Sequence, residues 1–146
     1  MRVLLDTDVV LDVLANRQPF VVEASVLWLA HEQGRIEAFI SPITPVNVFY
    51  ILRKQIGTSQ ARQLVGDLLA KIPVCLIDQA VIQTAHALPM ADFEDAVQAA
   101  AAAATALDVL ITRNVKDYSA APLTILTPAE ALARLTPSMP PPDPQP

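Results

Sequence analysis

The stretch Val3-Leu4-Leu5-Asp6-Thr7-Asp8 joins three apolar residues directly to a polar turn that carries two carboxylates. This pattern is typical of a short buried strand that ends at a loop. A carboxylate in that position is costly unless it is paired, hydrogen-bonded or bound to a metal. Asp6 is therefore expected to cap the helix that follows or to belong to a functional site, and its position alone fits both roles.

Two further polar clusters lie at similar junctions. Asp92-Phe93-Glu94-Asp95 opens a late helix, and Thr112-Arg113-Asn114-Val115-Lys116-Asp117 follows an apolar strand. Because the carboxyl ends of strands in an open parallel sheet share one rim, we expect these segments to be neighbours in the fold. Carboxylates gathered there repel one another unless a cation lies between them. A hard divalent metal suits such oxygen ligands, and its usual chemistry is phosphodiester hydrolysis.

Strand-like and helical segments alternate along the whole chain. The expected strands are residues 3–5, 36–40, 74–77, 109–112 and 123–126. The expected helices are residues 9–15, 19–33, 45–55, 59–71, 79–88, 92–107 and a last helix from 128 onward. This alternation predicts an α/β fold with a central parallel sheet of about five strands, covered by helices on both faces.

Local signals set several helix ends. Thr44-Pro45 is typical of a helix start, with Thr44 as the cap and proline in the first turn. Thr127-Pro128-Ala129-Glu130 has the pattern of a capping box. The alanine run from 99 to 104 favours a helix that approaches the sheet closely.

Composition indicates a soluble, cytoplasmic protein with one domain, residues 1–135. The chain has 146 residues, of which 53% are apolar, and no apolar run approaches the roughly 18 residues that would span a membrane. Its single cysteine, Cys75, excludes an internal disulfide framework and is expected to be a buried core thiol. Residues 136–146 carry six of the thirteen prolines and are expected to form an extended or disordered tail.

The net charge of −5 at first argues against a nucleic-acid partner. Seven acids, however, fall in or beside the expected rim, namely Asp6, Asp8, Asp12, Asp92, Glu94, Asp95 and Asp117. The other eight acids are outnumbered by the ten Lys and Arg residues. Five basic residues could then contact phosphate around the rim: Arg17, Arg53, Lys54, Arg113 and Lys116.

Each candidate residue also has an ordinary structural explanation. Asp92 and Glu94 would stabilise any helix start, whereas Asp95 is flanked by apolar residues and is the stronger functional candidate. Asp12 is expected to be solvated or paired with an arginine. Asn47 fits an imperfect capping box or a neutral ligand at the rim, and Asn114, Asp117 and Thr112 fit a turn.

In this order, the motifs resemble those of the PIN-domain family, which includes the VapC-type toxin ribonucleases of bacterial toxin–antitoxin pairs. The resemblance covers residues 3–132. Residues 5–12 are similar to the family's first motif, Asp95-Ala96 to its third, and residues 111–118 to its fourth. The resemblance implies a three-layer α/β/α sandwich and metal-dependent cleavage of single-stranded RNA with Mg²⁺ or Mn²⁺.

The resemblance also implies roles for individual residues. Asp6 and Asp95 match the central metal ligands. Asn47 stands where the second motif usually supplies a Glu, and Asn114 stands where an acid often follows Thr-Arg. A subgroup of PIN-like proteins looks similar to this chain at both positions, and Asp92 or Asp117 could replace the missing charge.

The predicted site therefore has three parts. The expected metal ligands are Asp6, Asp95 and Asp92. The expected catalytic set adds Asn47, Asn114 and Asp117. The residues expected to contact RNA are Thr112, Arg113 and Lys116.

The resemblance further implies the toxin of a type II toxin–antitoxin pair, with an antitoxin protein and a second copy of the chain as partners. Residues Phe20–Ala30, which include Trp28, are apolar on nearly every side. A helix of this kind is buried in its own fold or in a contact with another chain. This segment is therefore the expected dimer or antitoxin surface.

Two alternatives remain open. The asparagines at 47 and 114 favour a non-catalytic PIN-like module that binds RNA or a partner without turnover. Asp6-Thr7-Asp8 also fits the aspartyl-nucleophile start of haloacid-dehalogenase-like phosphatases, in which Asp6 would be phosphorylated and Asp8 would act as the acid. The chain is short for that second group.

Overall fold

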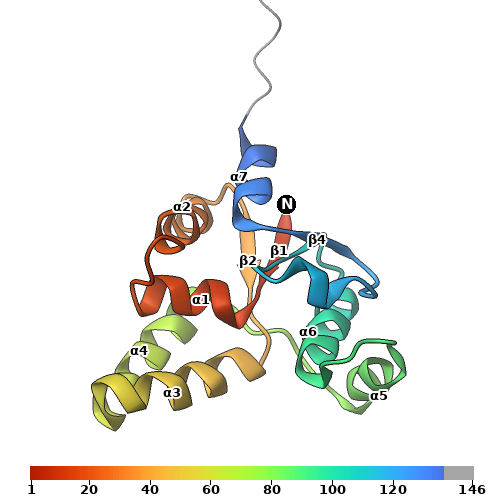
Figure 1. Ribbon diagram of the computed structural model, residues 1–146, viewed down its shortest axis with the longest axis horizontal. Coiled ribbons are helices and arrows are strands. Elements are labelled where there is room, and N and C mark those ends of the chain that lie inside the picture. The colour runs from red at the N-terminus through yellow and green to blue at the C-terminus, as the bar shows by residue number, and fades with distance from the viewer. Residues whose placement is uncertain (137–146) are drawn as a thin grey trace, which may run out of the picture.

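Four short parallel strands form the centre of the computed structural model, which describes residues 1–136 (Figure 1). β1 (Arg2–Leu5) lies between β2 (Glu37–Phe39) and β3 (Val109–Ile111), and β4 (Thr124–Leu126) pairs with β3 at the edge. Leu5 at the end of β1 pairs with Ile111 at the end of β3. The polar segments that follow these two strands therefore start side by side.

Seven α-helices and one 3₁₀ helix surround this sheet within the described residues. They are α1 (Thr7–Leu14), α2 (Val21–Glu32), α3 (Ile43–Ile56), α4 (Thr58–Lys71), α5 (Gln79–Ala87), α6 (Phe93–Ala104), η1 (Val115–Tyr118) and α7 (Pro128–Leu135).

Alternate residues of the central strands face two separate hydrophobic cores. Val3 and Leu5 pack with residues of α1–α4 and α7, whereas Leu4 between them packs with α5 and α6. This alternation follows from the two-residue period of a strand. Helices accordingly cover both faces of the sheet, as Figure 1 shows. The predicted three-layer α/β/α architecture is confirmed.

The expected strand at 74–77 is wrong in most of its length. Val74 makes only an isolated bridge to Ile40, and Leu76 is 88% exposed. The Ile40 N–H donates to the Pro73 carbonyl and the Cys75 N–H donates back to Ile40, but pairing ends there. The partner segment turns into α3 at Pro42, which also has no N–H to continue the ladder, so residues 76 and 77 have no strand to pair with. Cys75 is buried, as expected.

The helix ends agree with the sequence signals in one case and differ in another. Thr127 and Glu130 form the predicted capping box at the start of α7. Thr44 is not a cap, because α3 already begins at Ile43. The Thr44 hydroxyl is fully buried and lies 3.0 Å from the Thr7 hydroxyl, so it ties α3 to the start of α1.

Helix α2 divides its apolar residues between the core and the surface. Trp28 is only 9% exposed and belongs to the first core, whereas Val22, Val26 and Leu29 are 62%, 44% and 49% exposed. α2 begins at Val21, two residues later than expected. Of the predicted tail, residues 137–146 lie outside the described part of the chain.

No helix within residues 1–136 is long and apolar enough to cross a membrane.

We predict that the central strands carry much of the stability. Leu110→Ala should lower the free energy of unfolding by about 2–5 kcal/mol, because Leu110 is fully buried in the second core. Leu76→Ala, the same change at an 88% exposed position, should stay within about 0.5 kcal/mol. Urea denaturation of both variants would measure this. Equal losses would contradict the assignment of the two cores.

Candidate active site

Asp6 is the carboxylate at which three elements meet. It is 6% exposed and forms the N-cap of α1. Its Oδ1 accepts hydrogen bonds from the Thr7 N–H at 2.7 Å and from Gln98 Nε2 at 2.6 Å. Its Oδ2 accepts a bond from the Thr112 hydroxyl at 2.8 Å. These donors come from α1, from α6 and from the residue after β3. Asp6 therefore connects the first motif to the helix that carries the third motif and to the start of the fourth.

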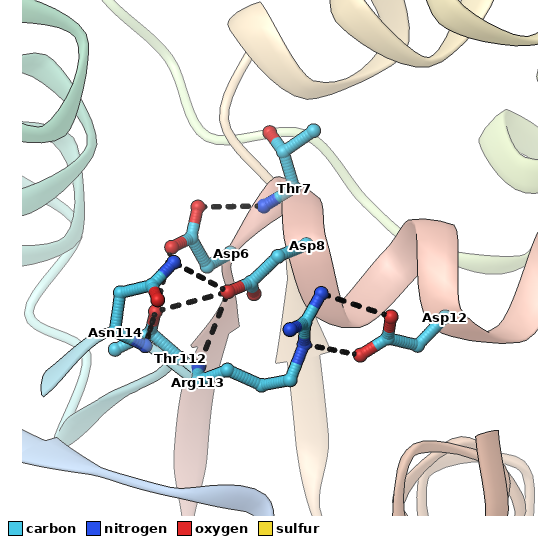
Figure 2. Close-up of polar contacts among 7 residues, drawn as sticks. All are labelled: Asp6, Thr7, Asp8, Asp12, Thr112, Arg113 and Asn114. Atoms are coloured by element: carbon cyan, nitrogen blue, oxygen red, sulfur yellow. Dashed lines mark hydrogen bonds and ion pairs between the residues drawn. The ribbon is translucent and has the colours of Figure 1, made fainter. Parts of the chain in front are cut away.

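Asp8 faces the loop that follows β3 (Figure 2). Its Oδ2 accepts bonds from the Arg113 N–H and from Asn114 Nδ2, both at 3.2 Å. Its Oδ1 is buried and makes no hydrogen bond within residues 1–136. Burial, with the nearby charge of Asp6, raises the pKa of Asp8 to about 6 against the opposing influence of Arg113. Asp8 is therefore a first-turn acid held by the fourth motif.

Asp12 is paired with an arginine, which is one of the two roles expected for it. The carboxylate is fully buried, and Arg113 donates to it through Nε at 2.8 Å and a second guanidinium nitrogen at 3.2 Å (Figure 2). The guanidinium also lies over the ring of Phe20, 4.0 Å from its centroid. Through these contacts, Arg113 anchors the loop after β3 against α1.

Asp95, in the first turn of α6, has a different electrostatic environment. Tyr118 donates its hydroxyl proton to Asp95 Oδ1 at 3.1 Å. Burial, followed by the charges of Asp6 and Asp92, raises the pKa of Asp95 to about 6. No Lys or Arg within residues 1–136 measurably opposes this shift. Burial and the charges of Asp6 and Asp95 raise the pKa of the Tyr118 hydroxyl, which therefore stays protonated as a donor.

The start of α6 meets α3 at the same rim. Asp92 caps α6 by accepting a bond from the Asp95 N–H at 3.0 Å. Asn47 of α3 donates its side-chain amide to Glu94. Burial and the charge of Asp92 raise the pKa of Glu94. Asn47 therefore reaches the rim, where a carboxylate from α6 stands beside it.

Three further residues predicted for the site, Asn114, Lys116 and Asp117, line a shallow groove. The groove has a volume of about 350 Å³ and is lined by Arg113, Asn114, Lys116, Asp117 and Thr127. Lys116 and Asn114 are exposed, whereas Thr112 is fully buried and its hydroxyl holds Asp6. Asp117 is close enough to contribute to the raised pKa of Asp95.

The sequence of this chain matches a known protein family. A sequence profile described as the PIN domain matches residues 2–116. The chain belongs to the PIN-domain family. The resemblance read from the motifs is thereby confirmed. A comparison with curated proteins found no match.

Solved structures share the PIN-domain fold of this chain. A toxin–antitoxin complex from Klebsiella pneumoniae is 26% identical, with a TM-score of 0.65 over 86% of this chain and 97% of that one. DNA-bound VapBC from Salmonella typhimurium is 16% identical, with a TM-score of 0.68 over 88% and 98%. VapBC2 from Rickettsia felis, bound to a promoter DNA fragment, is 17% identical, with a TM-score of 0.66 over 87% and 98%. At identities of 16% and 17%, the last two likenesses concern the fold alone.

The acids near Asp95 are compatible with the divalent metal that PIN-domain membership implies. The charges of Asp6, Asp92 and Asp117 all raise the pKa of Asp95. No three His, Cys, Asp or Glu side chains within residues 1–136 lie close enough together to hold one ion. Asp6 and Asp95 are connected through Gln98 and Tyr118. Mg²⁺ sites commonly combine one or two carboxylates with water and phosphate oxygens.

Two PIN-domain residues at this site were not predicted from the sequence. Gln98 and Tyr118 are each 1% exposed and connect Asp6 to Asp95. Gln98 stands one turn after Asp95, on the same helix face, and interrupts an alanine-rich run. A single glutamine among buried small residues was the available signal, since a polar side chain there needs a partner.

We predict that Asp95 destabilises the metal-free protein at neutral pH. Because its pKa is raised in the folded state, the native protein binds more protons than the unfolded chain between about pH 4 and 6. The free energy of unfolding should therefore fall as the pH rises through this window. Asp95→Asn, which keeps the hydrogen-bond acceptor for Tyr118, should weaken that slope and raise Tm slightly above pH 6.

Thermal melts in EDTA at low salt would measure this effect. Asp67→Asn provides a control, because Asp67 is exposed on α4. An Asp95→Asn variant that melts below the wild type at pH 7 would contradict the repulsion.

Proposed function

We propose that this PIN-domain protein is a metal-dependent endoribonuclease that cleaves single-stranded RNA. The observation that carries the proposal is the pair formed by Asp6 and Asp95 at the carboxyl rim of the sheet. Their charges are mutually unfavourable and uncompensated, although Arg113 lies close enough to neutralise Asp12. A bound cation would offset this repulsion.

Asp6 and Asp95 are the proposed ligands of Mg²⁺ or Mn²⁺, and Asp92 is proposed to complete the site directly or through water. When bound, such a metal lowers the pKa of a water molecule and shields phosphate charge. Asn47 and Asn114 each have an amide at the rim and are proposed to orient the water or the phosphate, with Asp117 beside them. Thr112 takes part by fixing Asp6.

RNA contact is proposed along the groove beside the fourth motif. Lys116 is exposed there and can place its ammonium group against a backbone phosphate. Arg113 is already paired with Asp12 but keeps 25% of its side chain exposed. Its proposed contribution is therefore to hold the groove in shape and to add positive potential.

We predict that Asp6→Asn and Asp95→Asn each reduce cleavage of labelled single-stranded RNA by more than about 100-fold, since each removes a charge from the metal site. The wild type should cleave in Mn²⁺ or Mg²⁺ and stop in EDTA. Asp67→Asn serves as the control for removing a surface carboxylate. Full activity in Asp6→Asn would refute the assignment.

The same assay separates the alternatives. A folded wild type that binds RNA, binds no metal and does not cleave RNA would favour the non-catalytic module. That alternative is supported by Asn47, Asn114 and the lack of a group of three acids within residues 1–136. Hydrolysis of a generic aryl phosphate would favour the phosphatase, against which the PIN-domain match weighs.

The proposed biological role is that of the toxin in a type II toxin–antitoxin pair. Its support is the likeness to structures of toxin–antitoxin and VapBC complexes, one of them at 26% identity. The antitoxin would be a second protein that binds this chain and suppresses cleavage. Co-expression with the product of a neighbouring reading frame, followed by co-purification, would test the pairing.

We further propose a homodimer in which the exposed stripe of α2 contacts a second copy. The stripe consists of Val22, Val26 and Leu29, which recur at helical spacing on one side of α2. Trp28 is excluded from this surface because it faces the core.

Val26→Glu should convert a dimer to a monomer without unfolding it, because Val26 is 44% exposed at the centre of the stripe. Light scattering coupled to size-exclusion chromatography would give the mass. Leu76→Glu, at an exposed position outside the stripe, should leave the dimer intact. An unchanged dimer with lost antitoxin capture would assign the stripe to the antitoxin instead.

A further inference from the structure

A chain of neutral hydrogen bonds connects the two carboxylates of the proposed metal pair. Gln98 Nε2 donates to Asp6 Oδ1 at 2.6 Å and to the Tyr118 hydroxyl oxygen at 3.2 Å. The Tyr118 hydroxyl in turn donates to Asp95 Oδ1 at 3.1 Å. Each of the two bridging residues is only 1% exposed. The carboxylates are therefore joined through the protein interior and not through solvent.

The direction of these bonds is fixed by the donors available. A side-chain amide has two protons on nitrogen, and both are used here. The tyrosine hydroxyl has one proton, and Asp95 receives it. A reversed amide would turn its oxygen toward the Asp6 carboxylate, where two acceptors would face each other. The chain thus runs from Gln98 outward to both acids.

The bridge formed by Gln98 and Tyr118 is neutral, unlike the ion pair between Arg113 and Asp12. Arg113 holds Asp12 with a positive charge and so removes Asp12 from the uncompensated acids. Gln98 and Tyr118 fix the position of Asp6 and Asp95 without cancelling their charge. Both carboxylates consequently keep their negative charge for a cation.

The bridge is not explained by folding stability alone. The Gln98 Oε1 atom is buried and makes no hydrogen bond within residues 1–136. A buried acceptor without a partner costs free energy, and an apolar residue of similar shape would avoid that cost. The two hydrogen bonds donated by Nε2 are therefore what Gln98 contributes at this position.

We propose that Gln98 and Tyr118 are positioning residues that set the spacing and orientation of Asp6 and Asp95 for a divalent cation. The inference rests on the proposed function, since it concerns the same two ligands. Partners that orient metal ligands typically contribute about 10–100-fold to metal affinity. Removing either bridging donor should weaken Mn²⁺ binding by at least about tenfold.

The test is calorimetric titration of Mn²⁺ into Gln98→Met and Tyr118→Phe, with thermal melts of the metal-free proteins. Gln98→Met keeps the length and volume of the side chain but has no donor. Tyr118→Phe removes only the hydroxyl. Matched controls are Gln83→Met and Tyr50→Phe, which make the same changes at exposed positions. We expect weaker Mn²⁺ binding in both bridge variants and unchanged binding in both controls, with the thermal melts showing that each variant is folded.

RNA cleavage provides a second readout. Raising the Mn²⁺ concentration should restore cleavage in Gln98→Met and Tyr118→Phe, because their ligands are present but misplaced. It should not restore cleavage in Asp6→Asn. If Gln98→Met does not fold, Tyr118→Phe alone decides the outcome.

Two failures are distinguishable. A wild type that binds no Mn²⁺ would overturn the metal site and this inference with it. A wild type that binds Mn²⁺, with both bridge variants binding it equally well, would overturn only the positioning role.

Discussion

The buried carboxylate of Asp6 is the constraint on which the rest of the site depends. An ionised group at 6% exposure is tolerable only when its oxygens are satisfied, and three donors meet that need. Because the donors belong to α1, α6 and the end of β3, they can converge only if β1 and β3 are adjacent parallel strands. The register that pairs Leu5 with Ile111 provides that adjacency. The fold and the site are thus fixed by the same contacts.

The acids around Asp6 fall into two electrostatic groups. On one side, Arg113 pairs with Asp12 and lowers the pKa that burial would otherwise give Asp8. On the other side, Asp95 and Glu94 are surrounded by like charge. The arginine anchors the loop after β3, and the unpaired acids face the rim. The arginine thus stabilises one group of acids and leaves the charge of the other group in place.

The sequence predicted the elements whose signals are local and missed those that depend on packing. The acids after β1 and β3 were predicted to share one rim because the ends of parallel strands lie at the same edge of a sheet. Pairing with an arginine was one of the two roles predicted for Asp12. The strand expected at 74–77 failed because the segment it would pair with turns into α3 soon after Ile40, which the local sequence of 74–77 does not show. Gln98 and Tyr118 were missed because their role appears only when α6 and η1 pack together.

The two asparagines that depart from the family pattern improve the charge balance of this particular site. Asn47 donates to Glu94, and Asn114 donates to Asp8 Oδ2 at 3.2 Å. An acid at either position would set two carboxylates against each other and add to charge that already raises the pKa of Asp8 and Glu94. Near position 47, the carboxylate comes from Glu94 on α6 instead of from α3. The amides therefore exchange a repulsion for a hydrogen bond while acidic oxygens remain at the rim, so their presence does not by itself imply a site that has lost its chemistry.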